Sequence, residues 1–309
     1  MRLIDALEDF YLSMEGVYSP NTLKWYRHKL QPLIWSLGDC HIEEITLQML
    51  RTWRADLAKK QTTYENHPTK PTKEGPMSRH TLHGHVRACR RFFKWLEEEE
   101  LLDYNLGKRL ELPSTPKGTR KGIKEKERDL IIEQAKKDNP RDYAIVLFLA
   151  DTACRAAGLA GLTLNRLDLI NLRAEVHEKG RGGNNKARLV YFGEKTKQAL
   201  EAWLRVRPGG PKCPYVFVNI HKKGGIHGLT VSGVYQAIER IAEEVGVKSD
   251  WNPHNWRHGS ARGMIKKGAS LAEVSQLLGH SSVNVTGDIY GIFSDEELHE
   301  SHKAYSWIE

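Results

Sequence analysis

Residues 252–258 read Asn252-Pro253-His254-Asn255-Trp256-Arg257-His258, and this heptapeptide has the features of a helix start. Asparagine is a preferred N-cap residue, and proline is preferred at the first helical position. The spacing places His254 and Arg257 on one face of the first turn, where free backbone N–H groups and the positive end of the helix dipole favour an anion. A capped surface helix with incidental polar residues explains the heptapeptide equally well.

A second informative segment, residues 277–282, follows this helix. The amphipathic pattern before it predicts a helix that ends at Gly279, and a serine caps the next helix. His280 falls in the junction, where a side chain can be held and aimed, although a hydrogen-bonded histidine in a turn is the simpler interpretation. Tyr290 comes ten residues later and is one of eleven tyrosines.

A third segment, residues 151–158, places Arg155 among small residues after a buried helical stretch. Small neighbours let a phosphate approach closely, and a fixed guanidinium offers the bidentate geometry that phosphate oxygens prefer. A buried arginine paired with a structural carboxylate is the alternative. Residues 173–192 then predict two strands around a glycine-rich turn that contains Lys179 and Lys186.

Taken together, these side chains are far more specific than any one of them. In chain order they are Arg155, Lys179, His254, Arg257, His280 and Tyr290. This set resembles the tyrosine recombinases, the family of phage integrases, Xer and Cre-type enzymes and transposon integrases. The family pattern is Arg, a hairpin Lys, His-x-x-Arg, Gly-His (or Trp) and a Tyr about ten residues further on. The resemblance is strong over residues 125–309, and over residues 1–110 it rests on helical character and position.

The resemblance implies that Tyr290 attacks the scissile DNA phosphate and leaves a 3′-phosphotyrosyl enzyme with a free 5′-hydroxyl. A phenol with a pKa near 10 is a weak nucleophile at neutral pH, so it needs a base and a cationic site. His254 is the candidate base. Lys179 is the candidate general acid that protonates the leaving 5′-oxygen.

The remaining residues are implied to bind the phosphate itself. Arg155 and Arg257 would hold its non-bridging oxygens and neutralise the pentavalent transition state, and His280 would donate a hydrogen bond to the same group. We therefore expect neither a metal nor another cofactor. No Asp/Glu cluster with magnesium spacing stands beside these residues, and the sequence has no phosphate-binding loop of the GxxxxGK(S/T) type.

The chain departs from the family pattern in three places. The family often has an acidic residue three positions after the first arginine, and here that residue is Gly158, so a carboxylate that supports Arg155 must come from elsewhere. The hairpin turn is longer than the usual Gly-Lys-Gly-x-Lys-x-Arg, so Lys186 stays open as the acid. Trp256 stands where leucine is common, which affects packing.

The fold expected from this pattern is mainly α-helical with a small β-sheet. Residues 1–111 predict a helical bundle that resembles the SAM-like core-binding domain, with Ser19, Thr46 and Ser78 as N-caps and Pro32 kinking or interrupting the second helix. Residues 112–124 predict a basic linker, and residues 125–309 a mixed α+β catalytic domain with a C-terminal tail. A further short strand is predicted over residues 215–218.

Composition sets outer limits on the function. A net charge of +8 favours a polyanionic partner weakly, and the scattered four cysteines indicate no disulfide framework. No stretch reaches the about 20 apolar residues of a membrane span, and no signal peptide is visible. We therefore expect an intracellular protein, cytoplasmic and associated with the nucleoid.

The implied partners are double-stranded DNA recombination sites and further copies of the chain, with a tetramer in synapsis. The apolar tail after Tyr290 would dock on a neighbouring protomer, or fold back on its own domain. A type IB topoisomerase-like enzyme and a catalytically inactive DNA-binding regulator are the alternatives. The cluster of His80, His83, His85 and Cys89 also allows a metal site, although a solvated or DNA-facing helix is the better interpretation.

Overall fold

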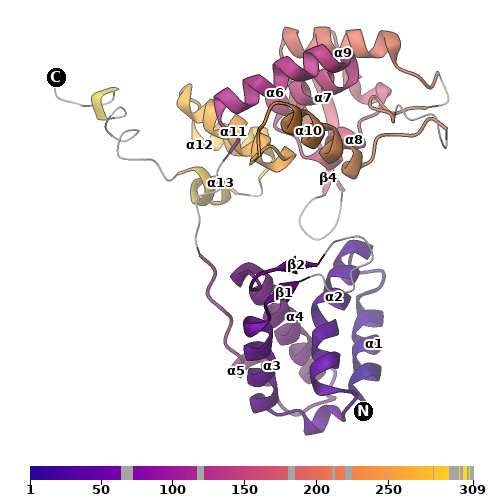
Figure 1. Cartoon of the computed structure of the whole chain (residues 1–309), viewed down its shortest axis with the longest axis vertical. Coiled ribbons are helices and arrows are strands. Elements are labelled where there is room, and N and C mark those ends of the chain that lie inside the picture. Colours follow the sequence, from indigo (N-terminus) through magenta and orange to yellow (C-terminus); the bar gives the residue numbers. More distant parts are fainter. Residues whose placement is uncertain are drawn as a thin grey trace. The chain divides into compact units, whose positions relative to one another are not determined.

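The structure is a computed structural model that describes residues 1–63, 72–116, 122–179, 185–210, 213–219, 225–248, 250–280 and 282–291, with 299, 302–304 and 306. The chain divides into two compact units, Met1–Gly118 and Thr119–Glu309 (Figure 1). Each unit has its own hydrophobic core, as a chain of this length requires. Within the described residues, no helix is both long and apolar enough to cross a membrane.

The first unit is a helical bundle, as the sequence predicts. Its helices are α1 (Leu3–Met14), α2 (Pro20–Leu37), α3 (Leu47–Lys59), α4 (Arg79–Glu98) and α5 (Leu106–Arg109), with a 3₁₀ turn, η1 (Ile42–Glu44). The predicted N-caps are confirmed, because the side chains of Ser19, Thr46 and Ser78 each accept a hydrogen bond from the backbone N–H three residues on.

Of the two effects predicted for Pro32, interruption of the helix is wrong. Helix α2 continues to Leu37, because the buried side chains of Leu30 and Leu33 on either side hold the helix against the core despite the lost hydrogen bond. The loop before α4 contains a short antiparallel ribbon of β1 (Thr62–Thr63) and β2 (Lys73–Glu74).

The second unit combines helices with one small sheet. Its helices are α6 (Glu125–Asp138), α7 (Pro140–Thr152), α8 (Ala156–Ala160), α9 (Glu194–Val206), α10 (Val231–Glu244), α11 (Pro253–Lys266), α12 (Leu271–Leu278) and α13 (Val283–Tyr290), with a 3₁₀ turn, η2 (Leu164–Arg166). Helix α7 is buried along most of its length, and α6, α9 and α11 pack against it. This central helix leads directly to the segment around Arg155.

The antiparallel sheet has the order β3 (Leu167–Asp168), β4 (Arg173–Lys179), β5 (Asn185–Tyr191). The β4–β5 register runs from Arg173 opposite Tyr191 to Lys179 opposite Asn185, which confirms the predicted hairpin with slightly longer strands. Side chains alternate along β4, so that Ala174, Val176 and Glu178 are all buried. The strand therefore delivers a carboxylate to its last inward position.

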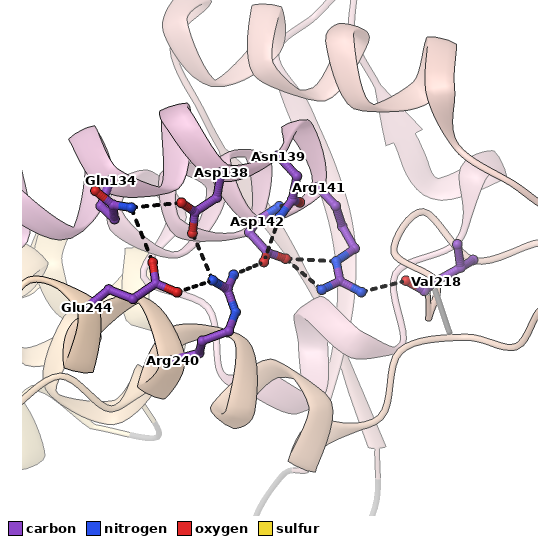
Figure 2. Close-up of polar contacts among 8 residues, drawn as sticks. All are labelled: Gln134, Asp138, Asn139, Arg141, Asp142, Val218, Arg240 and Glu244. Carbon is purple, nitrogen blue, oxygen red and sulfur yellow. Dashed lines mark hydrogen bonds and ion pairs between the residues drawn. The ribbon is translucent and has the colours of Figure 1, made fainter. Parts of the chain in front are cut away.

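Helices α6, α7 and α10 are joined by a polar network (Figure 2). The Arg240 guanidinium donates to the carboxylates of Asp138, Asp142 and Glu244 at 2.7–2.9 Å. Arg141 donates to the other oxygen of Asp142 at 2.8 Å. This network fixes the scaffold that carries α7.

The strand predicted over residues 215–218 does not form. Tyr215 and Val218 make isolated bridges to Thr163 and Gly228, and no continuous ladder joins them. Phe217 and Val218 are nevertheless fully buried, so the apolar run marks a core segment. A short apolar run without alternation cannot distinguish these two structures.

Candidate active site

Helix α11 begins as the sequence predicts. The Asn252 side chain accepts hydrogen bonds from the backbone N–H groups of His254 and Asn255, both at 3.1 Å, and Pro253 is the first helical residue. The two polar residues of the first turn differ in burial. His254 is exposed, whereas Arg257 is buried, so the predicted pair lies at the boundary between solvent and core.

Arg257 is held by backbone carbonyls from two directions. Its guanidinium donates to Ala153 O, in the turn after α7, at 2.8 Å and to Leu278 O at the end of α12. Burial, followed by the charge of Arg155, lowers the pKa of Arg257 to about 10. The side chain is therefore still a cation at neutral pH, fixed in a site of low dielectric.

Arg155 is supported by a carboxylate from β4. Its backbone N–H and its Nη1 each donate to Glu178, to Oε1 and Oε2 respectively, at 2.6 Å. Arg188 of β5 donates to the same Oε1 at 3.1 Å. Burial would raise the pKa of the Glu178 carboxyl, but the charge of Arg188, the Arg155 N–H and the charge of Arg257 together lower it. Glu178 is thus an anion that holds two arginines.

The C-terminus of α12 is fixed by two of these arginines. Arg188 donates to Leu277 O, and Arg257 donates to Leu278 O. Cations are favoured there because the last carbonyls of a helix lack helical partners. Gly279 adopts φ +66°, which ends the helix and turns the chain toward His280, as predicted.

His280 lies beside the arginines as a neutral imidazole. Its Nδ1 is 2.7 Å from the hydroxyl of Thr286, which fixes the ring. Burial lowers its pKa to about 4, and the charges of Arg257, Arg155 and Arg188 act in the same direction. A neutral imidazole carries one N–H, so it can be a hydrogen-bond donor without adding another charge.

Tyr290 is the last residue of α13, and it is 2% exposed. Its Oη is 2.6 Å from Nδ1 of His258, and its ring lies parallel to that of His280, with centroids 6.5 Å apart. The ring of His254 packs edge-on against that of His258 at 4.3 Å. A row of histidine rings therefore leads from the exposed His254 to the buried phenol.

The two candidate acids lie on opposite strands of the hairpin. Lys179 is the last residue of β4, and its side chain is outside the described residues, as are the turn residues 180–184. Lys186 lies in β5 and is exposed. The predicted apolar tail (Phe293, Leu298, Tyr305, Trp307 and Ile308) also falls outside the described part of the chain.

The structure thus brings Arg155, Arg257, His280 and Tyr290 into one site and adds three residues that the sequence reasoning missed. His258 was visible in the opening heptapeptide, four residues after His254 and on the same helix face. Arg188 matches the final Arg of the Lys-x-Arg in the family hairpin. Glu178 was indicated by the strand alternation, since a buried glutamate needs a cationic partner. Among the described residues, no group of three or more His, Cys, Asp or Glu could hold a metal ion.

Two family models match the sequence. The phage integrase family model matches residues 121–296, and the model of the phage integrase N-terminal SAM-like domain matches residues 7–67. The SAM-like match lies within the unit Met1–Gly118, and the integrase match lies within the unit Thr119–Glu309. The first alone spans more than half of the chain and contains every site residue described above.

Individual proteins agree with the family models. The tyrosine recombinase XerC of Haemophilus influenzae is 30% identical over 294 residues, which cover 94% of this chain and 92% of the relative. The Tn1549 transposon integrase, solved in complex with transposon right end DNA, has a TM-score of 0.72 at 17% identity and covers 99% of this chain and 100% of that one. A lambda integrase tetramer bound to a Holliday junction has a TM-score of 0.70 at 15% identity, covering 96% and 80%. The two structures share the fold, and the sequence matches show that this chain belongs to the phage integrase family.

Proposed function

We propose that the chain is a site-specific DNA recombinase that cuts and rejoins DNA through a covalent bond between Tyr290 and a 3′-phosphate. The observation that carries the proposal is the convergence of a tyrosine hydroxyl, two arginines and a neutral histidine at one place. The charges of Arg155 and Tyr290 both affect the pKa of Arg257, so these groups lie within electrostatic range of one another. Such a set suits one phosphodiester.

The reaction forms one bond and breaks one. Tyr290 Oη attacks the phosphorus, its proton passes to the histidine pair of His258 and His254, and the bond to the 5′-oxygen breaks. Lys179 gives a proton to that oxygen, with Lys186 as the alternative donor. Rejoining reverses these steps when a 5′-hydroxyl of another strand attacks the phosphotyrosine, so the bond energy is conserved.

The arginines and His280 act on the charge that develops in this step. Arg155 has a side chain that is 40% exposed while Glu178 holds its other face, so it can meet a phosphate oxygen without losing its support. Arg257 and the N–H of His280 complete a fixed set of donors. Preorganised donors of this kind stabilise a transition state because they need no reorganisation during the reaction.

Burial of Tyr290 adds a requirement. Because the side chain is 2% exposed, a DNA phosphate reaches its hydroxyl only after α13 or its neighbours shift. The proposal therefore includes a rearrangement of α13 when DNA binds. The buried state keeps the nucleophile away from other phosphates until then.

The partners follow from the same reaction. Residues 1–111 and 125–309 would both bind duplex DNA, with the basic linker 112–124 between them in the sequence. Exchange between two duplexes requires four cuts, so four copies act together, and the apolar tail after Tyr290 is the proposed contact between them. The protein would act in the cytoplasm, on DNA of the nucleoid.

The decisive experiment traps the covalent intermediate. DNA that remains attached to the protein after denaturation of expressing cells identifies the site, and a nicked duplex with that site then serves as a suicide substrate. We expect the wild type and the exposed-site control Tyr191→Phe to form a covalent adduct, and Tyr290→Phe to form none. If Tyr290→Phe behaves as the wild type, the proposal is wrong. Strand exchange between two sites, rather than relaxation alone, excludes the topoisomerase alternative.

A further inference from the structure

The N-terminus of helix α8 has no side-chain cap within the helix. Arg155 is its N-cap residue. In a capping box, a glutamate at the third helical position accepts a hydrogen bond from the N-cap backbone N–H. That third position is Gly158, which has no side chain to offer.

Glu178 makes the missing hydrogen bond from another element. Its Oε1 accepts from the backbone N–H of Arg155 at 2.6 Å, which is the bond that a glutamate at position 158 would make. Its Oε2 accepts from the guanidinium of the same residue at 2.6 Å. One carboxylate therefore fixes both the backbone and the side chain of Arg155, and it is 4% exposed.

The absence of a side chain at position 158 makes this arrangement possible. A Cβ built on Gly158 would lie 3.1 Å from Cγ and 3.2 Å from Oε1 of Glu178, and 3.2 Å from Cβ of Val176. These separations are shorter than ordinary van der Waals contact. A side chain at position 158 and the carboxylate of Glu178 thus compete for one space.

From this geometry we infer that Glu178 is the positioning residue of Arg155, supplying from β4 the carboxylate that α8 lacks at Gly158. The inference rests on the proposed function, in which Arg155 neutralises the scissile phosphate. Because Glu178 also holds Arg188, which donates to Leu277 O, it links Arg155 to the end of α12 and hence to His280. Glu178 itself touches no reacting atom.

The test exchanges the carboxylate between the two elements. Glu178→Gln keeps the shape but removes the charge, and we expect it to lower the single-turnover rate of adduct formation about 10²-fold, the cost of a small misplacement in an active site. Gly158→Glu alone should lower the rate of adduct formation by a similar factor, because two carboxylates then compete for one space. The double variant Gly158→Glu/Glu178→Ala should recover to within about tenfold of the wild type, since one carboxylate again meets the Arg155 N–H.

Two controls separate positioning from folding. Glu175→Gln removes an exposed carboxylate from the same strand, where it pairs with His177 and Arg166, and it should leave the rate unchanged. A neutral methylphosphonate at the scissile position needs less cationic stabilisation. The defect of Glu178→Gln should therefore shrink at least tenfold on that substrate, as that of Arg155→Ala should.

The outcomes are distinct. If the wild type forms no adduct, the proposed function fails. If the wild type forms an adduct but Glu178→Gln reacts at the wild-type rate, the positioning role is wrong. The role is also wrong if Glu178→Gln slows adduct formation by the same factor on ordinary DNA and on the methylphosphonate substrate. A double variant no faster than Glu178→Gln would also overturn it.

Discussion

The hydroxyl of Tyr290 lies 2.6 Å from Nδ1 of His258, and both side chains are 2% exposed. His258 is thus the imidazole in contact with the proposed nucleophile, and the ring of His254 packs edge-on against the ring of His258. The resemblance gives the role of the base to His254, and we propose from this contact that His258, the second histidine of the heptapeptide, shares that role.

Replacement of His258 tests this proposed role. We expect His258→Ala to lower the rate of adduct formation about 10²-fold, because a proton acceptor in contact with the nucleophile is lost. His254→Ala should cost less. Both rates are measured under single-turnover conditions, with DNA binding followed separately. If a His258→Ala protein reacts as fast as the wild type, or faster, the contact with His258 holds Tyr290 in its buried position and has no part in proton transfer.

Arg257 should not tolerate lysine. Its two Nη atoms donate to carbonyls of separate segments, at Ala153 and Leu278, and an ammonium on a flexible stem cannot reproduce that fork. We expect Arg257→Lys to lower the cleavage rate about 10²-fold or more with little change in DNA affinity. The matched change Arg205→Lys, on the exposed side of α9, should have no effect on either quantity.

The general acid can be identified by changing the leaving group of the DNA. In a 5′-phosphorothiolate substrate the 5′-end departs as a thiolate, which needs no proton. We expect Lys179→Ala to be slow on ordinary DNA and to approach the wild-type rate on the phosphorothiolate, whereas Lys186→Ala should respond equally to both substrates. The reverse pattern would assign the acid to Lys186.

The stability of the first unit should fall in acid because of His85. This side chain is 3% exposed, with Nδ1 2.8 Å from Lys29 O and Nε2 3.4 Å from the Lys29 ammonium, and the ring of His28 lies nearby. Burial, followed by the charge of Lys29, lowers its pKa from 6.5 to about 4. Below pH 6.5 His85 binds a proton in the unfolded chain but not in the folded chain. The free energy of unfolding therefore decreases as the pH falls from 6.5 to 4.

The expected loss is on the order of 2 kcal/mol across that window. It is measured by urea unfolding of the full chain at several pH values. His85→Gln should flatten the dependence, and His80→Gln, on the exposed part of the same helix, should not. An unchanged slope in His85→Gln would assign the acid sensitivity to other groups.

Among the residues of the α6–α7–α10 network, Asp142 should cost the most unfolding free energy when it is replaced. It is 1% exposed and accepts hydrogen bonds from both Arg141 and Arg240 (Figure 2). We expect Asp142→Ala to lower the unfolding free energy of the second unit by about 3 kcal/mol, because the buried Arg141 loses its counter-ion. Glu244→Gln, which alters the exposed edge of the network, should cost under about 1 kcal/mol. Comparable losses in the two variants would contradict this account.

Most of the helical architecture could be predicted because its signals are local. Ser19, Thr46, Ser78 and Asn252 each cap a helix through a backbone N–H two or three residues away, so the sequence carries both partners together. The failed predictions concern segments whose structure depends on distant packing. Pro32 stays within α2 because its neighbours are buried, and residues 215–218 fill the core without forming a strand.

The candidate active site also has a part that the sequence indicated and a part that depends on distant packing. The order and spacing of Arg155, His254, Arg257, His280 and Tyr290 carried the resemblance to the tyrosine recombinases, and that resemblance implied a phosphoryl-transfer site. Residue type and position in a turn or helix are properties of the chain itself. The partners of those residues are not. Glu178 meets Arg155 across 23 positions, and His258 meets Tyr290 across 32, and only the packing of β4 on α8 and of α13 against α11 sets those distances. The amino-acid sequence by itself determined the candidate groups for the proposed chemistry, while the tertiary structure decided what holds each of them, because hydrogen bonds between distant elements form only when the elements pack.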